Sequence, residues 1–260
     1  MTRHPALYQW QAIVGKRLPL LSKPMVACLA LWSFGMIIAR SCALTAVALT
    51  LAPILKQGFF TVRERLRDLY REAAAKAGSK RRTLDLSACW APWLRWVIRD
   101  WGHQQLAVAL DATSLGQRFV VLTLSVLYRG SAVPVAWKIL HATEKHPWNP
   151  EWQTLLQQFQ HVVPTGWTVI ALADRGLYSK ELYQAIQDAG WHPLLRINRQ
   201  GYFRPAGWYH WRRLDKLIQR PSQRWQGRVT VFKNTAGQLL CTLLASWEER
   251  PDRAQKAPMS

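Results

Sequence analysis

The chain is poor in acidic residues. Only 15 of its 260 residues are Asp or Glu, against 35 Lys or Arg, which gives a formal net charge of +20. A protein this basic is expected to meet a polyanion, most often a nucleic acid. The basic surplus is 11 in residues 1–100, 2 in residues 101–200 and 7 in residues 201–260. A nearly neutral middle between basic arms indicates arms that bind phosphates around a segment that carries chemistry. The alternative is a basic protein with solvated Lys and Arg side chains.

Paired cysteines and several enzyme motifs are also missing. The four cysteines are scattered and form no C-x-x-C pair, so neither a zinc site nor a disulfide framework is indicated, and reduced cytosolic thiols are expected. There is no Gly-x-Ser-x-Gly elbow, P-loop or His-Glu-x-x-His sequence. Hydrolases of the serine type, NTPases and zincins therefore lack support.

No single hydrophobic run is long enough to span a bilayer. Residues 25–55 hold two apolar stretches of about 15 residues on either side of Arg40, and a transmembrane helix needs about 20 residues. Joined, the stretches would place an arginine in mid-membrane. We therefore expect two buried helices; a membrane-associated protein built on residues 25–55 is the alternative.

Residues 1–100 are predicted to form a helical, basic, DNA-binding region. A helix is expected over 61–73, opened by a capping box of Thr61 and Glu64. Four arginines (Arg63, Arg65, Arg67 and Arg71) lie mostly off its apolar face, and the helix either contacts DNA or is an ordinary surface helix. A basic loop follows, which suits phosphates or is no more than a linker. The residues predicted to bind DNA in this region are Arg63, Arg67 and Arg71 on the helix and Lys80, Arg81 and Arg82 in the loop.

Residues 101–200 change to a pattern of strands and helices. Strands are expected at 106–111, 119–128, 132–140, 167–173 and 193–197, and helices follow Asn149 and the N-cap Ser179, in the order β-β-β-α-β-α-β. A helical crossover makes the strand at 167–173 parallel to its neighbour.

Two aspartates follow apolar runs in this segment: Asp111 ends the run from Leu106, and Asp174 ends the run from Trp167. If the two strands are neighbours, both carboxylates emerge at one sheet edge, where α/β folds place their chemistry. Two such carboxylates are suited to hold a divalent metal ion between them.

These residues resemble a known family. Leu110-Asp111-Ala-Thr-Ser, the strand-turn-strand that follows, and Ala173-Asp174-Arg-Gly-Leu-Tyr-Ser are similar to the DDE transposases of bacterial insertion sequences, of the insertion-sequence-4 type. The resemblance covers about residues 60–245. It implies an RNase H-like catalytic core over 101–200, with Asp111 and Asp174 as catalytic, metal-binding carboxylates.

The resemblance also implies what such a protein does. The activity would be DNA cleavage and strand transfer in transposition, with Mg²⁺ or Mn²⁺ as cofactor. The partners would be transposon ends and target DNA, bound by a homodimer on paired ends, and the location would be the cytoplasm, at the nucleoid. No membrane partner is implied.

The third carboxylate of the family is missing. It belongs to a Tyr-x2-Arg-x3-Glu pattern, and the nearest match here, Tyr209 and Arg212, has Lys216 at the glutamate position. Residues 201–260 are expected to be the start of a basic, β-rich insertion with a frayed tail. The expectation is a truncated copy, inactive as it stands or completed by a second reading frame, with the third carboxylate unknown.

Further basic residues are predicted to bind DNA. Arg175 either contacts a phosphate or pairs with Asp174. Arg204, Arg212 and Arg213 are interleaved with aromatic residues that would clamp a strand end by stacking and charge. Three other functions stay open beside the transposase: a DNA-binding remnant without catalysis, the membrane-associated protein built on residues 25–55, and a structure-specific nuclease with the same fold.

Overall fold

The computed structural model describes residues 4–78, 82–143, 147–233 and 238–247. The chain divides into two compact units. Unit 1 comprises residues 1–104 and 157–167, and unit 2 comprises residues 105–156 and 168–260.

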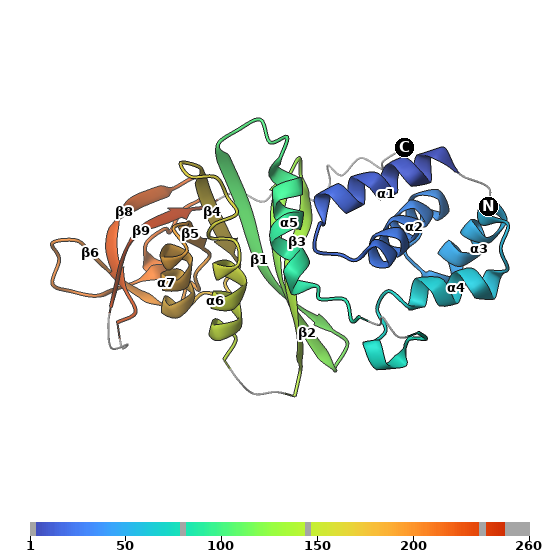
Figure 1. The fold of residues 1–260 in the computed structure, drawn as a ribbon. Helices are drawn as coiled ribbons and strands as arrows, with labels where there is room; N and C mark the ends of the chain where they lie inside the picture. The colour runs from blue at the N-terminus through green and yellow to red at the C-terminus, as the bar shows by residue number, and fades with distance from the viewer. Residues whose placement is uncertain (1–3, 79–81, 144–146, 234–237, 248–260) are drawn as a thin grey trace. The chain divides into compact units, whose positions relative to one another are not determined.

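Unit 1 is helical. Its helices are α1 (Pro5–Arg17), α2 (Lys23–Ala39), α3 (Leu44–Leu55), α4 (Phe59–Arg67) and α5 (Ser87–Ile98), with a short 3₁₀ helix at Ala73–Ala75 (Figure 1). The apolar stretches of residues 25–55 thus form two separate helices, as predicted. Within the described residues, no helix alone has the length and apolar character to cross a membrane; α2 and α3 meet that requirement only as a pair, bent by 96°.

The core of unit 1 is built by α2, α3 and α4. Leu31, Leu51 and Leu66 are almost fully buried and belong to one apolar cluster. Gly35 lets α2 and α3 approach closely, because a Cβ at this position would lie only 2.7 Å from methyl carbons of Leu51 and Val47.

The helix α4 does not begin where the sequence predicts. Gly58 is its N-cap residue, no side chain caps it, and the helix starts at Phe59 rather than after Thr61. The capping box of Thr61 and Glu64 was therefore a wrong prediction. Phe59 packs against the unit 1 core, and this burial extends the helix in the N-terminal direction, while Glu64 is engaged by arginines instead.

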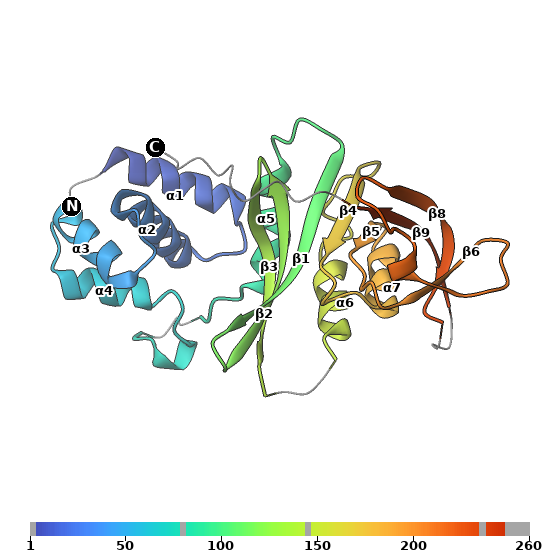
Figure 2. The ribbon, with the colours of Figure 1, turned by 180° about the vertical axis from the view of Figure 1, so that it is seen from behind.

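Unit 2 contains a mixed five-stranded sheet. Its strands are β1 (Gln105–Leu115), β2 (Phe119–Tyr128), β3 (Ser131–His141), β4 (Thr168–Ala173) and β5 (His192–Leu195), in the spatial order β3-β2-β1-β4-β5. The first three strands form an antiparallel meander, and β4 and β5 run parallel to β1. Figures 1 and 2 show β1 in the middle of the sheet between β2 and β4. The predicted mixed α/β architecture is confirmed.

Two helices connect the strands of this sheet: α6 (Asn149–Gln157) precedes β4, and α7 (Lys180–Asp188) lies between β4 and β5. The predicted cap of α7 is present, since the Ser179 hydroxyl accepts a hydrogen bond from the Leu182 amide at 3.0 Å. Leu182 and Ile186 bury the apolar face of α7. The chain turns at Gly190, with φ of +78°, and enters β5.

A second, four-stranded sheet follows in unit 2. It contains β6 (Tyr202–Pro205), β7 (Arg212–Arg213), β8 (Arg224–Val231) and β9 (Leu239–Ser246), in the order β7-β6-β8-β9. Phe203, Val229 and Leu243 are at the centre of its apolar core. The β-rich character expected beyond residue 200 is thus present in the described residues.

Candidate active site

The register of β1 against β4 places the two aspartates side by side. Leu110 pairs with Ala173 in the parallel ladder, so Asp111 and Asp174 are the next residues on the two chains. Neighbouring strands are about 4.8 Å apart. The sequence predicts that β4 is parallel to its neighbour and leaves open which strand that is; the neighbour is β1, and the pairing brings both residues to one edge of the sheet.

Both aspartates also belong to the same face of the sheet by alternation. Leu110 and Ala173 are buried, and each is followed by an exposed aspartate. Side chains alternate between faces along a strand, so the residues after a registered buried pair share the opposite face. The sheet thus offers two solvent-accessible carboxylates at one edge and on one face.

The end of β1 differs from the prediction. Asp111 does not end the strand, which continues to Leu115 paired with β2, where Asp111 lies opposite Thr123. The pairing with β4 stops at Leu110. Asp111 is therefore held by a ladder on one side only, with its other side open toward Asp174. An apolar run shows where burial ends, and it cannot show how far a partner strand extends the ladder.

Local hydrogen bonds hold each carboxylate. The Thr113 hydroxyl donates to Asp111 Oδ2 at 2.5 Å, as residues two apart on a strand share a face. The Arg175 backbone N–H donates to Asp174 Oδ1 at 2.6 Å. The Arg196 guanidinium lies 3.8 Å from the same oxygen, with both side chains mostly exposed. These contacts fix the carboxylates and leave them open to a ligand.

The donor set fits a hard divalent cation in part. Carboxylate oxygens are preferred ligands of Mg²⁺ and Mn²⁺, and Asp111 and Asp174 supply them. A cation of this kind takes about six oxygens, so two carboxylates leave most positions to water or substrate. Among the described residues there is no group of three His, Cys, Asp or Glu side chains placed to hold a metal.

Beside Asp174 there is a polar cavity rich in arginine. It measures about 410 Å³ and follows the ends of β4 and β5. Its lining consists of Arg175, Arg196, Ile197, Asn198, Arg199, Gln200, Arg213 and Asp215. We call these residues the arginine pocket. The sequence pointed to Arg175 and Arg213 but missed Arg196 and Arg199, for which the only signal was an Arg-x-x-Arg sequence directly after an apolar strand.

Arg213 is paired inside this pocket. Its guanidinium donates to both carboxylate oxygens of Asp215, at 3.1 and 2.6 Å. This pairing lowers the pKa of Asp215 and raises that of Arg213. The positive charge of Arg213 is thus largely neutralised by Asp215.

The other predicted arginines of the second sheet face aromatic rings. The guanidinium of Arg204 lies 5.1 Å from the centre of the Trp211 ring, and that of Arg212 lies 5.7 Å from the centre of the Trp208 ring. Such stacking presents flat cationic surfaces. Tyr209, in the same turn, is 91% exposed. This arrangement is suited to stacking on bases, and that role stays a prediction.

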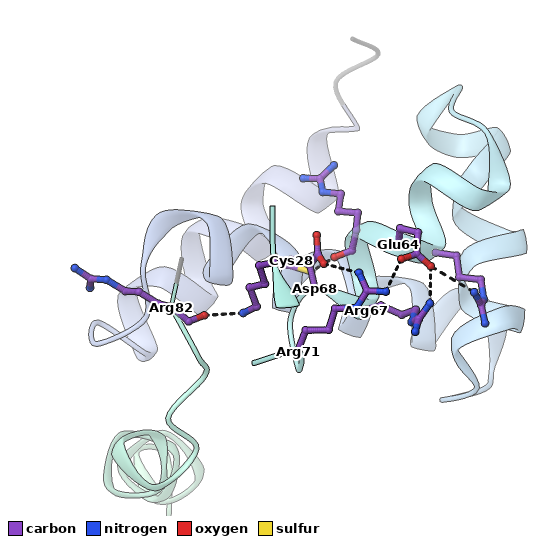
Figure 3. Close-up of polar contacts among 9 residues, drawn as sticks. Cys28, Glu64, Arg67, Asp68, Arg71 and Arg82 are labelled. Atoms are coloured by element: carbon purple, nitrogen blue, oxygen red, sulfur yellow. Dashed lines mark hydrogen bonds and ion pairs between the residues drawn. The ribbon is translucent and has the colours of Figure 1, made fainter. Parts of the chain in front are cut away.

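Arg63 and Arg67 on α4, and Arg71 four residues beyond the end of that helix at Arg67, are engaged by acidic neighbours (Figure 3). Glu64 accepts from Arg67 at 2.8 Å and from Arg71 at 2.8 Å, and Arg63 lies 3.5 Å away. Arg71 also contacts Asp68 at 3.1 Å. The hydrogen bond from Arg67 is the main reason that the pKa of Glu64 is lowered. Arg63, Arg67 and Arg71 therefore form an internal network with Glu64 and Asp68 that competes with phosphate binding.

The basic loop is only partly described. Lys80 and Arg81 lie outside the described residues. Arg82 is exposed, and its carbonyl oxygen accepts a hydrogen bond from Lys76 Nζ at 2.6 Å. A phosphate-binding role for this loop stays a prediction.

Comparisons with known proteins give only weak similarities. No protein-family model matches the chain, and no curated protein matches it significantly. Among solved structures, the Mos1 strand transfer complex is similar with 11% identity and a TM-score of 0.24, over 64% of this chain and 57% of that one. The simian T-cell lymphotropic virus intasome, in complex with PP2A regulatory subunit B56 gamma, is similar with 8% identity and a TM-score of 0.24, over 56% of this chain and 82% of that one. This chain thus spans little more than half the length of the Mos1 chain, and at these TM-scores neither similarity is evidence of function.

Proposed function

We propose that this chain acts on DNA as a metal-dependent phosphoryl transferase of the transposase type, with an RNase H-like core in unit 2. The observation that carries the proposal is the parallel register of β1 and β4, in which Leu110 pairs with Ala173 and the next residue on each strand is an exposed aspartate. The large basic surplus supports a polyanionic substrate.

The two carboxylates would hold the divalent ion, Mg²⁺ or Mn²⁺. Such an ion supplies Lewis-acid stabilisation of a phosphoryl group and lowers the pKa of water. Asp111 is oriented for this role by the Thr113 hydroxyl, and Asp174 by the Arg175 amide. Arg196, loosely paired with Asp174, can turn to a phosphate oxygen once the carboxylate charge is balanced by a cation.

The finer assignments rest on the sequence resemblance. The insertion-sequence-4 type, strand transfer to target DNA, the homodimer on paired ends and the nucleoid location remain predictions. So does the third carboxylate, which would add a ligand to the small number that Asp111 and Asp174 offer. With these two carboxylates and water as the ligands of the ion, we expect slow nicking by this chain, and a third carboxylate would raise the rate.

Nicking of supercoiled plasmid tests the proposal. The wild-type chain should convert plasmid to open circles with Mg²⁺ or Mn²⁺ and not with EDTA, and Asp111→Asn and Asp174→Asn should both abolish this. Asp188→Asn is the matched control. Asp188 ends α7 just before β5 begins, and because β5 is parallel to β4, this is the sheet edge opposite Asp111 and Asp174. Equal nicking by all three variants, or none by the wild type, would contradict the proposal.

Binding without cleavage is a second candidate function. The observation that favours it is the small acidic set at the candidate active site beside an arginine pocket. With this function, the wild-type chain would retain plasmid in a gel-shift experiment and leave it intact with either metal. A labelled 3′ end that becomes joined to target DNA would exclude both this function and a simple nuclease.

A further inference from the structure

We propose that the arginine pocket binds a backbone phosphate of a DNA strand, next to the position that the two carboxylates act on. This inference rests on the proposed function for the identity of the strand, since it extends the same site beyond Asp174. It assigns a role to Arg199 and Arg196, which the sequence did not single out.

The first support is the free positive charge in the pocket. Of its four arginines, Arg213 is paired with Asp215, and Arg196 is loosely paired with Asp174. Within the described part of the chain, the guanidinium groups of Arg175 and Arg199 form no hydrogen bond or close ion pair; the charge of Arg199 acts on Asp215 only at longer range, as a minor cause of the lowered pKa of that carboxyl. Both residues are exposed. Two unpaired guanidinium groups at one cavity are suited to a phosphate, which arginine binds through parallel N–H donors.

The second support is the fixed backbone of the pocket. The Arg196 amide donates to the Ala173 carbonyl at 2.9 Å, which ties the end of β5 to the residue before Asp174. Asn198 accepts the Gln200 amide through its side chain at 3.2 Å and the Gly201 amide through its carbonyl at 3.3 Å. An ordered loop lowers the entropy cost of binding, so the backbone that holds these arginines is preorganised for a ligand.

The third support is the size and polarity of the cavity. At about 410 Å³, it lies in the range of roughly 300–1,000 Å³ typical of small-ligand sites. Ile197 is the sole apolar side chain among its lining residues, so an apolar ligand would find little to bury. A phosphate with part of its sugar suits both the volume and the charge.

The carboxylates at the border select the orientation of the ligand. Asp174 would repel an anion that lies over it without a cation. A strand that places one phosphate in the arginine pocket and the next over a cation at Asp111 and Asp174 satisfies both signs of charge. A compact free anion gains only the first contact. Extended polyanions are therefore favoured over inorganic phosphate.

The test measures DNA binding without metal, so that it does not depend on catalysis. Anisotropy of a fluorescent oligonucleotide duplex is recorded in EDTA over a series of salt concentrations, for the full chain and for the double variant Arg175→Gln/Arg199→Gln. The matched control is Arg220→Gln/Arg224→Gln, which removes the same charge from exposed residues of unit 2 outside the arginine pocket. Thermal unfolding verifies that both variants are folded.

The pocket variant should bind at least 10-fold more weakly than the control at the same salt. Each lost phosphate contact should reduce the slope of log K against log salt by about 0.9, so the pocket variant should lose one to two units. Equal affinities and slopes for the two variants would overturn the inference.

Titration with inorganic phosphate separates a strand site from a free-anion site. The wild-type chain should bind inorganic phosphate far more weakly than the oligonucleotide. If the pocket variant loses inorganic phosphate and keeps the oligonucleotide, the pocket is a free-anion site and the inference is wrong. If plasmid is never nicked and the pocket variant still loses DNA, the proposed function fails and strand binding stands.

Discussion

Arginines around α4 and arginines of the arginine pocket differ in how far acidic neighbours neutralise their charge. On α4 and in the turn that follows it, Glu64 and Asp68 engage Arg63, Arg67 and Arg71 in one network. The arginine pocket contains four arginines, of which Arg213 pairs with Asp215 and Arg196 lies loosely against Asp174. A basic surplus counted along the chain therefore does not locate phosphate binding. What decides is how many guanidinium groups are left without an acidic partner once the chain has folded.

The largest expected effect is on the nicking rate, and it should distinguish Asp174 at the candidate active site from Asp68 at the end of α4. Asp174→Cys should lower the nicking rate in Mg²⁺ on the order of 100-fold or more, since metal stabilisation amounts to several kcal/mol and 1.36 kcal/mol is a factor of ten. Mn²⁺ accepts a soft thiolate better than Mg²⁺ does and should restore part of the rate. Rates are measured by plasmid nicking in each metal.

Asp68→Cys is the counterpart on α4, where the acid pairs with Arg71 and has no proposed contact with a metal. Its nicking should match the wild type in both metals. A variant of Asp174 that is fully active in Mg²⁺ would remove the catalytic role from this edge of the sheet.

The next effect concerns the packing of unit 1 and leaves unit 2 untouched. Gly35→Ala places a methyl group 2.7 Å from side-chain carbons of Leu51 and Val47. Overpacking of this kind costs about 1–3 kcal/mol, partly offset by the better helix propensity of alanine. The free energy of unfolding, measured with urea, should therefore fall.

Gly15→Ala is the matched control in α1, because its Cβ would lie 3.4 Å from Val26. It should be neutral or stabilising. Under native conditions both variants should bind DNA as the wild type does, since the arginine pocket is in the other unit. Loss of DNA binding by folded Gly35→Ala would place phosphate contacts in unit 1.

Alkaline pH provides a third effect confined to unit 1. Burial raises the pKa of the Cys28 thiol from 9.0 to about 11, and the thiol donates to the Arg65 carbonyl at 3.0 Å. Below pH 9 both states keep the proton. Between pH 9 and 11 only the unfolded state ionises, so stability is lost over that window, up to about 2 kcal/mol.

Comparison of Cys28→Ala with the wild type isolates this contribution. The variant should lose less free energy of unfolding between pH 9 and 11, and Cys42→Ala, at an exposed position, should follow the wild type. Identical pH profiles for Cys28→Ala and the wild type would show that the thiol does not contribute.

The fold of unit 2 was predictable to a large extent because its signals are local. Apolar runs bounded by turns predicted β1 to β5, and Ser179 predicted the start of α7. The helical crossover predicts that β4 is parallel to its neighbour in the sheet, and it leaves open that this neighbour is β1. These features depend only on residues that are close together in the sequence and on the general right-handedness of crossover connections.

The rest depended on partners that are distant in sequence. The start of α4 was misjudged because Phe59 is drawn into the core, and the extension of β1 past Asp111 depends on β2. Arg199 and Arg213 meet only because the second sheet returns to the end of β5, with the Leu214 amide donating to the Gly201 carbonyl at 2.9 Å. Periodicity contains no information about such contacts.

The smallest expected effect is a gain of DNA affinity when the arginines near α4 lose their acidic partner. Glu64→Gln removes the negative charge that Arg67 and Arg71 share and replaces one of the two acceptor oxygens with an amide NH₂ group, so both guanidinium groups are held less tightly. The freed arginines should add up to two phosphate contacts, which would raise DNA affinity a fewfold at low salt and steepen the slope of log K against log salt by about one. The measurement is the anisotropy series in EDTA, with Glu181→Gln, in the first turn of α7, as the matched loss of one negative charge. If both variants gain equally, the gain comes from net charge alone and α4 does not face DNA. If Glu64→Gln gains more, α4 is a second phosphate-binding surface that its own glutamate holds in check.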